Sequence, residues 1–307
     1  MDWIHNLGDP GELLLTDLIL PGTHDSAAYR IDWTIDNPNS SLASIIYFGK
    51  QICCLKNHIE KWAITQNNSI YDQLVLGARF LDLRIVDING IWYLHHEVIC
   101  DTLALGLSQI KKFINETNEP IAISILPRNL SKNNVQSLTD IFCNEFTNQI
   151  WEYDRAPIRE MQLSGKVVYL ILDNIVDFPI PPIFRSQTTY LNLWYRTTNP
   201  YTKLRFLYTC LEKLDNRDAF VNITFTLTPS FQYLFINLLI GLFVSRSLFS
   251  LDKTMKIGLE YFVTHRDITK ASTITFDYFN ARVSKIIQDL NKDIVYRSRI
   301  KNMINYY

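Results

Sequence analysis

Apolar, strand-like runs of this chain end in ionisable side chains that could take part in chemistry. One run leads directly into the neighbouring pair His24 and Asp25. Another carries Asp82 and Arg84 at alternate positions, which places both charges on one face of a strand. The residues between and beside them are apolar, so this charged face is not simply the solvent side of an amphipathic strand. A third run ends in two adjacent histidines.

Those two histidines, His95 and His96, would point to opposite sides of a strand, so we expect only one of them to face a site. A late apolar run carries a lone carboxylate, Asp277. If the strands form a barrel, the last strand lies beside the first, and Asp277 lies next to His24. A carboxylate beside an imidazole fixes its tautomer and stabilises its protonated form. Any one of these residues alone would usually be structural, but together they predict an acid–base site.

Seven runs rich in β-branched and apolar residues are separated by segments of helical length. The predicted strands are Leu18–Leu20, Ala78–Ile85, Ile91–His95, Ile121–Leu126, Lys166–Leu172, Ala219–Leu227 and Ile274–Phe279. Thr102–Asn115 and Val135–Phe146 are predicted helices, since their apolar residues repeat along one face. Alternating strands and helices without a glycine-rich nucleotide loop predict an α/β fold, a (β/α) barrel in a single domain over residues 1–307. Residues at the carboxyl ends of such strands converge on one mouth.

Composition excludes several classes of protein. The 307 residues are 47% hydrophobic and 20% charged, as in a folded globular protein, and the net charge of −1 does not favour nucleic-acid binding. Five cysteines, with Cys53 and Cys54 adjacent and no CxxC spacing, favour a reducing compartment. The amino-terminal residues lack the pattern of a secretory signal, and Tyr233–Val244 is too short to span a membrane. We therefore expect a cytoplasmic protein, with peripheral membrane contact as an option.

The motifs that carry this chemistry resemble those of a known family. Leu20–Ser26, Gly77–Arg84 and Leu94–His96 resemble, in order and spacing, the X domain of phosphatidylinositol-specific phospholipases C. Leu227–Pro229 and Ile274–Phe279 are similar to segments of the small eukaryotic proteins that contain only this domain. The resemblance implies a distorted TIM barrel of parallel strands surrounded by helices. It also implies a phosphodiesterase with two catalytic histidines.

The resemblance assigns roles to six catalytic residues, His24, Asp25, Asp82, Arg84, His96 and Asp277. His24 would take the proton of the inositol 2-hydroxyl, and His96 would protonate the departing diacylglycerol oxygen. Asp277 would orient His24, while Asp25 would orient His96. Arg84 would bind the phosphoryl oxygens, and Asp82 would hold Arg84 and the histidines in place. The second of the adjacent histidines matches the acid of the family, which favours His96 over His95.

Metal independence is predicted from one position. Calcium-dependent members of the family carry acidic residues two apart in this strand, whereas this chain has Asp82 and Arg84. A guanidinium there supplies a cation and would repel calcium, so no cofactor is expected. The pocket for the head group departs from the bacterial pattern, because the lysine expected after Ser124 is missing. Arg128 is a candidate replacement, and Tyr195 is a candidate for stacking on the inositol ring.

The predicted partners are a phosphoinositide-type lipid and, transiently, a membrane surface. Phe231–Phe249 is either a buried barrel helix or a segment that dips into the lipid interface through its aromatic residues. Two other functions remain open. One is a different barrel phosphodiesterase, such as a glycerophosphodiesterase or a sphingomyelinase D-like enzyme, although these use a Glu-x-Asp metal site. The other is a non-catalytic lipid-binding module.

Overall fold

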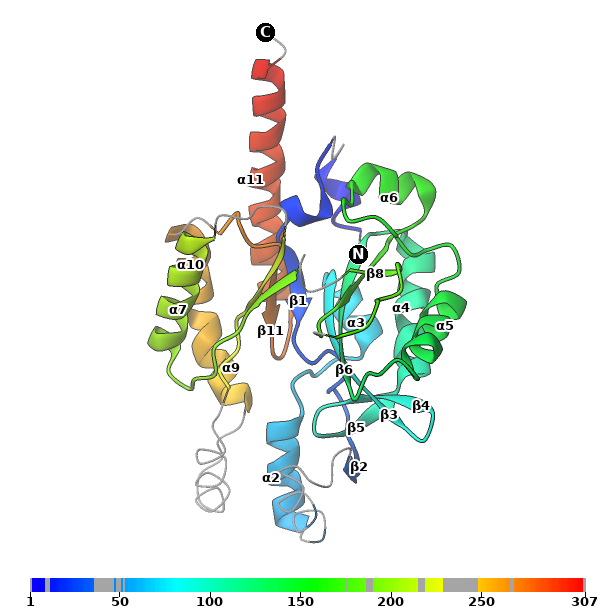
Figure 1. Ribbon diagram of the computed structural model, residues 1–307. Helices are drawn as coiled ribbons and strands as arrows, with labels where there is room; N and C mark the ends of the chain where they lie inside the picture. Colours follow the sequence, from blue (N-terminus) through cyan, green and yellow to red (C-terminus); the bar gives the residue numbers. More distant parts are fainter. Residues whose placement is uncertain are drawn as a thin grey trace.

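A computed structural model of the protein describes residues 2–8, 12–35, 47, 51, 53–174, 176–185, 190–214, 219–228, 248–265 and 268–305. Its centre is a sheet of 11 strands covered by helices (Figure 1). Eight of these strands are joined by parallel pairings in one continuous order. They are β9 (Tyr190–Leu193), β10 (Phe220–Thr224), β11 (Thr273–Phe276), β1 (Leu20–Thr23), β3 (Phe80–Ile88), β6 (Ile121–Arg128), β7 (Val168–Leu172) and β8 (Phe184–Arg185). The expected α/β fold with a parallel, barrel-like wall is confirmed, although no pairing within the described residues joins β8 to β9.

The remaining strands form an antiparallel branch, which the sequence analysis did not anticipate. β3 turns back through Asn89 and Gly90 into β4 (Ile91–His95). Both turn residues have positive φ, 55° and 83°, as a two-residue hairpin requires. β5 (Val98–Thr102) and β2 (Asp32–Ile35) extend this branch. The predicted strand at 91–95 therefore exists, but it is not part of the parallel wall.

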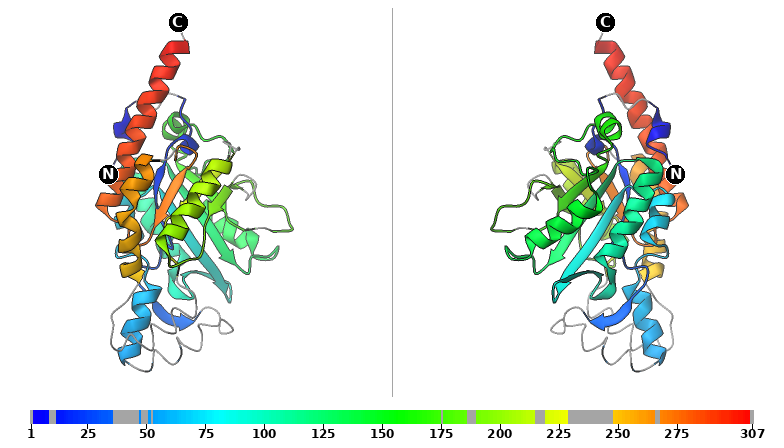
Figure 2. Two further views of the ribbon diagram at one scale, coloured as in Figure 1. Left: turned by 90° about the vertical axis from the view of Figure 1, so that its left-hand side faces the viewer. Right: turned by 90° about the vertical axis from the view of Figure 1, so that its right-hand side faces the viewer.

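The helices of the described residues are α2 (Cys53–Ala63), α3 (Ile70–Val75), α4 (Leu103–Thr117), α5 (Val135–Glu145), α6 (Ile158–Ser164), α7 (Pro200–Lys213), α9 (Leu248–Ile257), α10 (Leu259–His265) and α11 (Ala281–Asn305), with short 3-10 helices at His5–Leu7 and Leu15–Asp17. Most of them pack on the outside of the wall, whereas α2 lies beyond one end of it and the last part of α11 extends past the other (Figures 1 and 2). The two predicted helices are confirmed as α4 and α5. The Thr102 hydroxyl caps α4 by accepting the Leu105 N–H, and Asn118 ends the helix in a left-handed conformation.

Aromatic rings fill the amino-terminal end of the wall. Phe220 stacks against Phe80 at 5.7 Å and against Tyr169 at 6.1 Å between ring centroids, and Tyr190 packs beside them. All four rings are buried. Packed side chains fill this end, whereas His24 and Asp277 follow the carboxyl ends of β1 and β11 at the other end.

Two observations concern contact of this protein with a membrane. Among the described residues, no helix is both long enough and apolar enough to cross a bilayer. The apolar segment Phe231–Phe249 lies outside the described residues except for its last two positions, which begin α9. The choice between a buried helix and an interfacial segment therefore stays a prediction.

Candidate active site

His24 and Asp277 meet where two parallel strands end side by side. Thr23 of β1 pairs with Phe276 of β11, so the next residue of each strand is a neighbour of the other. His24 Nδ1 lies 2.8 Å from Asp277 Oδ1, and both side chains are buried. An ionised carboxylate only accepts, so Nδ1 carries the proton and Nε2 is left as the basic nitrogen of the neutral ring. The pairing predicted for these two residues is present.

Asp25 lies at the centre of the cluster. Its backbone has a left-handed φ of 43°, and its N–H donates to Asp82 Oδ2 at 3.2 Å. Its Oδ2 lies 3.2 Å from His96 Nε2 and 3.5 Å from His24 Nδ1, while its Oδ1 contacts Arg84 Nε. Burial would raise the pKa of this carboxyl, but Arg84 and the histidines outweigh it and lower the pKa to about 2. Asp25 is therefore an anion that links both histidines to the arginine.

Arg84 supplies a permanent positive charge beside the base. Its Nη2 lies 3.0 Å from His24 Nε2 and 4.0 Å from Asp82 Oδ2. Burial lowers the pKa of this guanidinium, but four carboxylates, Asp25 first and then Asp82, Asp277 and Glu97, raise it above its ordinary value. A developing negative charge near His24 Nε2 would thus meet a fixed cation.

The same arginine bears on metal binding. Within the described residues, His24, Asp25 and Asp82 form the one group of three side chains that could hold a metal ion, with ligand atoms within 4.8 Å of one another. Arg84 contacts all three of them. A divalent cation would have to displace the guanidinium or accept its repulsion, so these residues fit a metal poorly as they stand.

His96 is held at both ring nitrogens. Its Nδ1 lies 2.8 Å from the carbonyl oxygen of Ala63, and its Nε2 faces Asp25. A carbonyl and a carboxylate both accept, so the doubly protonated ring satisfies both contacts. This is the form that a general acid needs.

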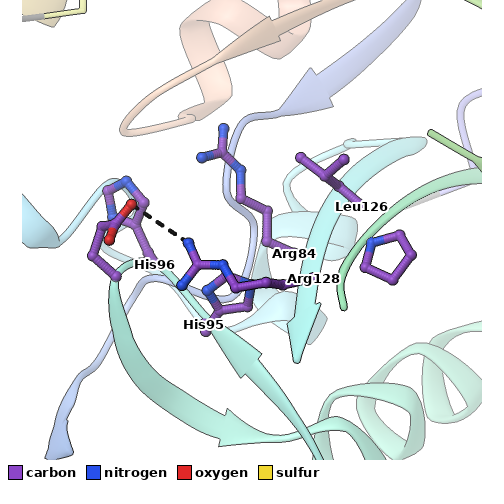
Figure 3. A pocket seen from close by; sticks show the side chains of 7 residues that line it. Arg84, His95, His96, Leu126 and Arg128 are labelled. Atoms are coloured by element: carbon purple, nitrogen blue, oxygen red, sulfur yellow. Dashed lines mark ion pairs between the residues drawn. The ribbon is translucent and has the colours of Figure 1, made fainter. Parts of the chain in front are cut away.

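The expectation that only one of the adjacent histidines faces the site is wrong. His95 and His96 both line a pocket of about 210 Å³ (Figure 3). The register shifts after Leu94, β4 ends at His95, and Glu97 has a φ of 61°. Strict alternation of side chains applies only inside a regular strand, so it does not extend to His96.

The pocket also holds one of the two residues predicted to bind substrate. Arg128 lines it together with Arg84, and Arg128 Nη2 lies 3.5 Å from Glu97 Oε1, the ion pair drawn in Figure 3. Leu126 and Pro127 complete the lining. The pocket thus joins the proposed catalytic cluster to a second guanidinium, which suits an anionic or polyhydroxylated group.

The other predicted substrate-binding residue, Tyr195, is not brought to the cluster. Its ring stacks on Phe206 of α7, with 4.9 Å between centroids, and 41% of the residue is exposed. The neighbouring Trp194 lies at the cluster, where Tyr195 was expected: its ring lies 6.2 Å from that of His24 and 5.7 Å from the Arg84 guanidinium. A signal was available, since Trp194 directly follows β9 just as His24 directly follows β1.

Two lysines near Asp277, the buried Lys203 and the partly buried Lys256, were also missed. Lys256 Nζ donates to the carbonyl oxygens of Asp277 and Tyr278 and forms an ion pair of 2.6 Å with Asp252. Lys203 Nζ donates to the carbonyl of Tyr195, and burial lowers its pKa to about 7 although Asp277 opposes the shift. Neither lysine belongs to a strand-end motif, so no local pattern marked them.

The comparisons with known proteins point to one group of relatives. No family model matches the chain. A zebrafish PI-PLC X domain-containing protein 1 is 31% identical over 203 residues, covering 63% of this chain and 62% of the relative. The human PI-PLC X domain-containing protein 3 is 24% identical over 243 residues, 74% of each chain. A Dictyostelium discoideum PI-PLC X domain-containing protein is 32% identical over 108 residues, which is 34% of this chain but only 17% of that relative. Two of these three relatives are therefore matched over less than two thirds of their own length.

Solved structures share the fold. The phosphatidylinositol-specific phospholipase C of Listeria monocytogenes superposes with a TM-score of 0.64 over 94% of this chain and 97% of its own, at 17% identity. A mutant of the Staphylococcus aureus phosphatidylinositol-specific phospholipase C gives the same TM-score at 14% identity, covering 94% and 96% of the two chains. The fold is that of a PI-PLC-like α/β barrel. In sequence, the chain is similar to PI-PLC X domain-containing proteins.

Proposed function

We propose that this protein is a metal-independent phosphodiesterase that cleaves a phosphatidylinositol-like lipid into diacylglycerol and a cyclic inositol phosphate. The observation that carries the proposal is the buried cluster in which Asp25 links His24, His96 and Arg84. Two histidines in different hydrogen-bonding environments can act as base and acid in one turnover. A module that only binds lipid has no need for that division.

In the proposed reaction, His24 Nε2 removes the proton of the inositol 2-hydroxyl, whose oxygen attacks the neighbouring phosphorus. The bond from phosphorus to the diacylglycerol oxygen breaks, and the proton that this oxygen gains comes from His96. Asp277 stabilises the imidazolium that forms at His24 through the 2.8 Å contact at Nδ1. The reaction leaves His24 protonated and His96 deprotonated, so before the next turnover His24 must give up a proton to water and His96 must take one up.

Arg84 is proposed to bind the phosphoryl oxygens. Its guanidinium lies within hydrogen-bonding distance of His24 Nε2, so a phosphate bound by Arg84 would lie next to the hydroxyl that His24 deprotonates. Trp194 packs beside both residues and keeps water from that side. Arg128, on the pocket wall, is proposed to contact the head group.

Metal independence is supported by the contacts of Arg84 with all three side chains of the candidate metal group. The test is incubation of the purified protein with phosphatidylinositol in EDTA, with the water-soluble products read by phosphorus NMR. We expect a cyclic inositol phosphate to form at an unchanged rate with and without the chelator. Absence of any cyclic phosphate across a panel of inositol lipids would overturn the proposed reaction. Activity that is lost in EDTA and restored by magnesium or calcium would instead indicate a metal-dependent phosphodiesterase.

A further inference from the structure

The segment that follows α2 touches both halves of the proposed acid–base pair. It comprises Ala63, the last residue of α2, and the three residues up to Gln66. The carbonyl of Ala63 accepts the Nδ1–H of His96 at 2.8 Å. At the other end of the segment, Gln66 reaches the backbone around His24. No motif in the sequence pointed to these residues.

Gln66 ties the ends of β1 and β11 together. Its Nε2 donates to the carbonyl oxygen of His24 at 2.8 Å and to that of Phe276 at 2.9 Å. Its Oε1 accepts the N–H of Phe279 at 3.0 Å. The side chain is 1% exposed, so all three bonds are sheltered from water. One amide thus joins the backbone of the base to both sides of the turn that carries Asp277.

The same turn needs such support because its backbone is unusual. Tyr278 follows Asp277 with a φ of 44°, a backbone conformation that residues other than glycine rarely adopt. Its N–H donates to the carbonyl of Thr65 at 2.5 Å, and its hydroxyl donates to the carbonyl of Ile64 at 2.6 Å. The last backbone hydrogen bond between these strands runs from the His24 N–H to the carbonyl of Phe276 at 3.0 Å, so the ladder does not set the turn beyond Phe276.

We propose that Gln66 is a positioning residue of the active site, which holds the imidazole of His24 and the carboxylate of Asp277 at hydrogen-bonding distance. The kinetic part of this inference rests on the proposed function. Charged groups face His24 from three segments: Asp25 from its own, Asp277 after β11, and Asp82 and Arg84 from β3. Gln66 touches the backbone of the first two segments, so its loss moves His24 relative to Asp277 and leaves Arg84 in place.

The chain offers a matched control in Asn291 of α11. This amide is fully buried and bonds to both backbone groups of Ile19, donating to the carbonyl at 2.7 Å and accepting the N–H at 2.8 Å. It therefore also joins β1 to a distant segment, but before the strand rather than at its catalytic end. Gln66→Met and Asn291→Leu each replace a buried amide by an apolar side chain of similar shape, which leaves the backbone partners of the amide without a hydrogen bond.

We expect both variants to lose stability in urea, while only Gln66→Met changes the site. Its kcat should fall by about ten- to a hundredfold with little change in KM, since small misplacements of catalytic groups cost that much. In substrate-free protein, the titration midpoint of His24, followed by histidine NMR, should move to lower pH as the contact with Asp277 weakens. In Asn291→Leu the midpoint and kcat should remain those of the wild type.

The milder variant Gln66→Asn, whose side chain is too short to reach both carbonyls, should show the same shifts to a smaller extent. An unchanged His24 midpoint in a folded Gln66 variant, or an equal shift in Asn291→Leu, would overturn the positioning role. Loss of the fold in both Gln66 variants would overturn it as well, because Gln66 would then serve the whole fold. Because the NMR titration needs no substrate, it still tests Gln66 if the wild type proves inactive on every inositol lipid, an outcome that would overturn the proposed function alone.

Discussion

The replacement Asp277→Asn tests the proposed base most directly. Burial lowers the pKa of His24 and Arg84 lowers it further, but the carboxylates Asp25 and Asp277 outweigh both and raise it above 6.5. A general base works only above its own pKa, so the acidic limb of kcat/KM in the wild type should lie above pH 6.5. Asparagine is close in shape to aspartate but carries no charge, so the limb should move to lower pH.

The rate should fall even though the base becomes easier to deprotonate. Asparagine can turn its amide toward His24 Nδ1, which favours the tautomer with the proton on Nε2, where the base is needed. Loss of an orienting carboxylate in this way costs about 10⁴-fold in kcat in the well-studied serine protease triad, and we expect about 10³- to 10⁴-fold here. The assay is the pH dependence of initial rates on phosphatidylinositol in detergent micelles, read by phosphorus NMR.

Stability supplies an independent readout of the same contact. His24 has a higher pKa in the folded than in the unfolded chain, so its protonation stabilises the fold below pH 6.5, and this contribution is lost as the pH rises through the folded pKa. Measurements at about pH 6 and pH 9 lie on either side of this loss of stability. In Asp277→Asn, the difference in unfolding free energy between these two pH values should be smaller than in the wild type. Asp101→Asn is the control, since that aspartate is also largely buried and pairs with Arg30 away from the site. A variant at Asp277 with an unmoved limb and a kcat within about threefold of the wild type would refute this reasoning.

Three further predictions concern the rest of the cluster. His96→Ala should lower kcat by about 10²- to 10⁴-fold, the usual range for a general acid, whereas His95→Ala should keep most of the activity; the reverse result, from the same initial-rate assay, would assign the acid to His95. Arg84→Lys keeps a charge but cannot contact His24 and Asp25 together, so we expect about a hundredfold loss of kcat in EDTA, and an unchanged rate would contradict the role of the guanidinium. Asp25 has a pKa lowered from 3.8 to about 2, so its ionised form contributes on the order of 2 kcal/mol to stability above pH 3.8, lost as the pH falls through about 2. Between about pH 5 and pH 3 this carboxylate begins to protonate in the unfolded chain, so the unfolding free energy of the wild type should fall over that range. In Asp25→Asn, urea unfolding at the same pH values should not show this fall, and a fall as large as in the wild type would mean that other groups cause it.

The antiparallel hairpin shows where local patterns stopped being sufficient. The run Ile91–His95 reads as a strand whichever way it pairs, because apolar β-rich composition does not encode direction. The turn signal was nevertheless present: Asn89-Gly90 supplies the two positive φ values of a tight hairpin. A parallel crossover needs many more residues than these two, so the length of the connection could have decided the direction.

The substrate-binding residues show a second limit. Arg128 lines the same pocket as Arg84 and His96, whereas Tyr195 stacks on Phe206 and Trp194 lies beside His24. Adjacent residues after a strand end can turn to either side, and the backbone after the strand decides which one faces inward. Residue type alone could not separate a tryptophan from a neighbouring tyrosine.

The sequence by itself determined the α/β pattern and the residue types at the strand ends, because these depend on local periodicity and composition. It also singled out six residues that sit in short recognisable motifs, His24, Asp25, Asp82, Arg84, His96 and Asp277. Only the tertiary structure decided how these groups meet. His24 and Asp277 are 253 positions apart, and their contact depends on the pairing of β1 with β11. Gln66 carried no local signal, because its role lies entirely in hydrogen bonds to backbone groups that the fold brings to it.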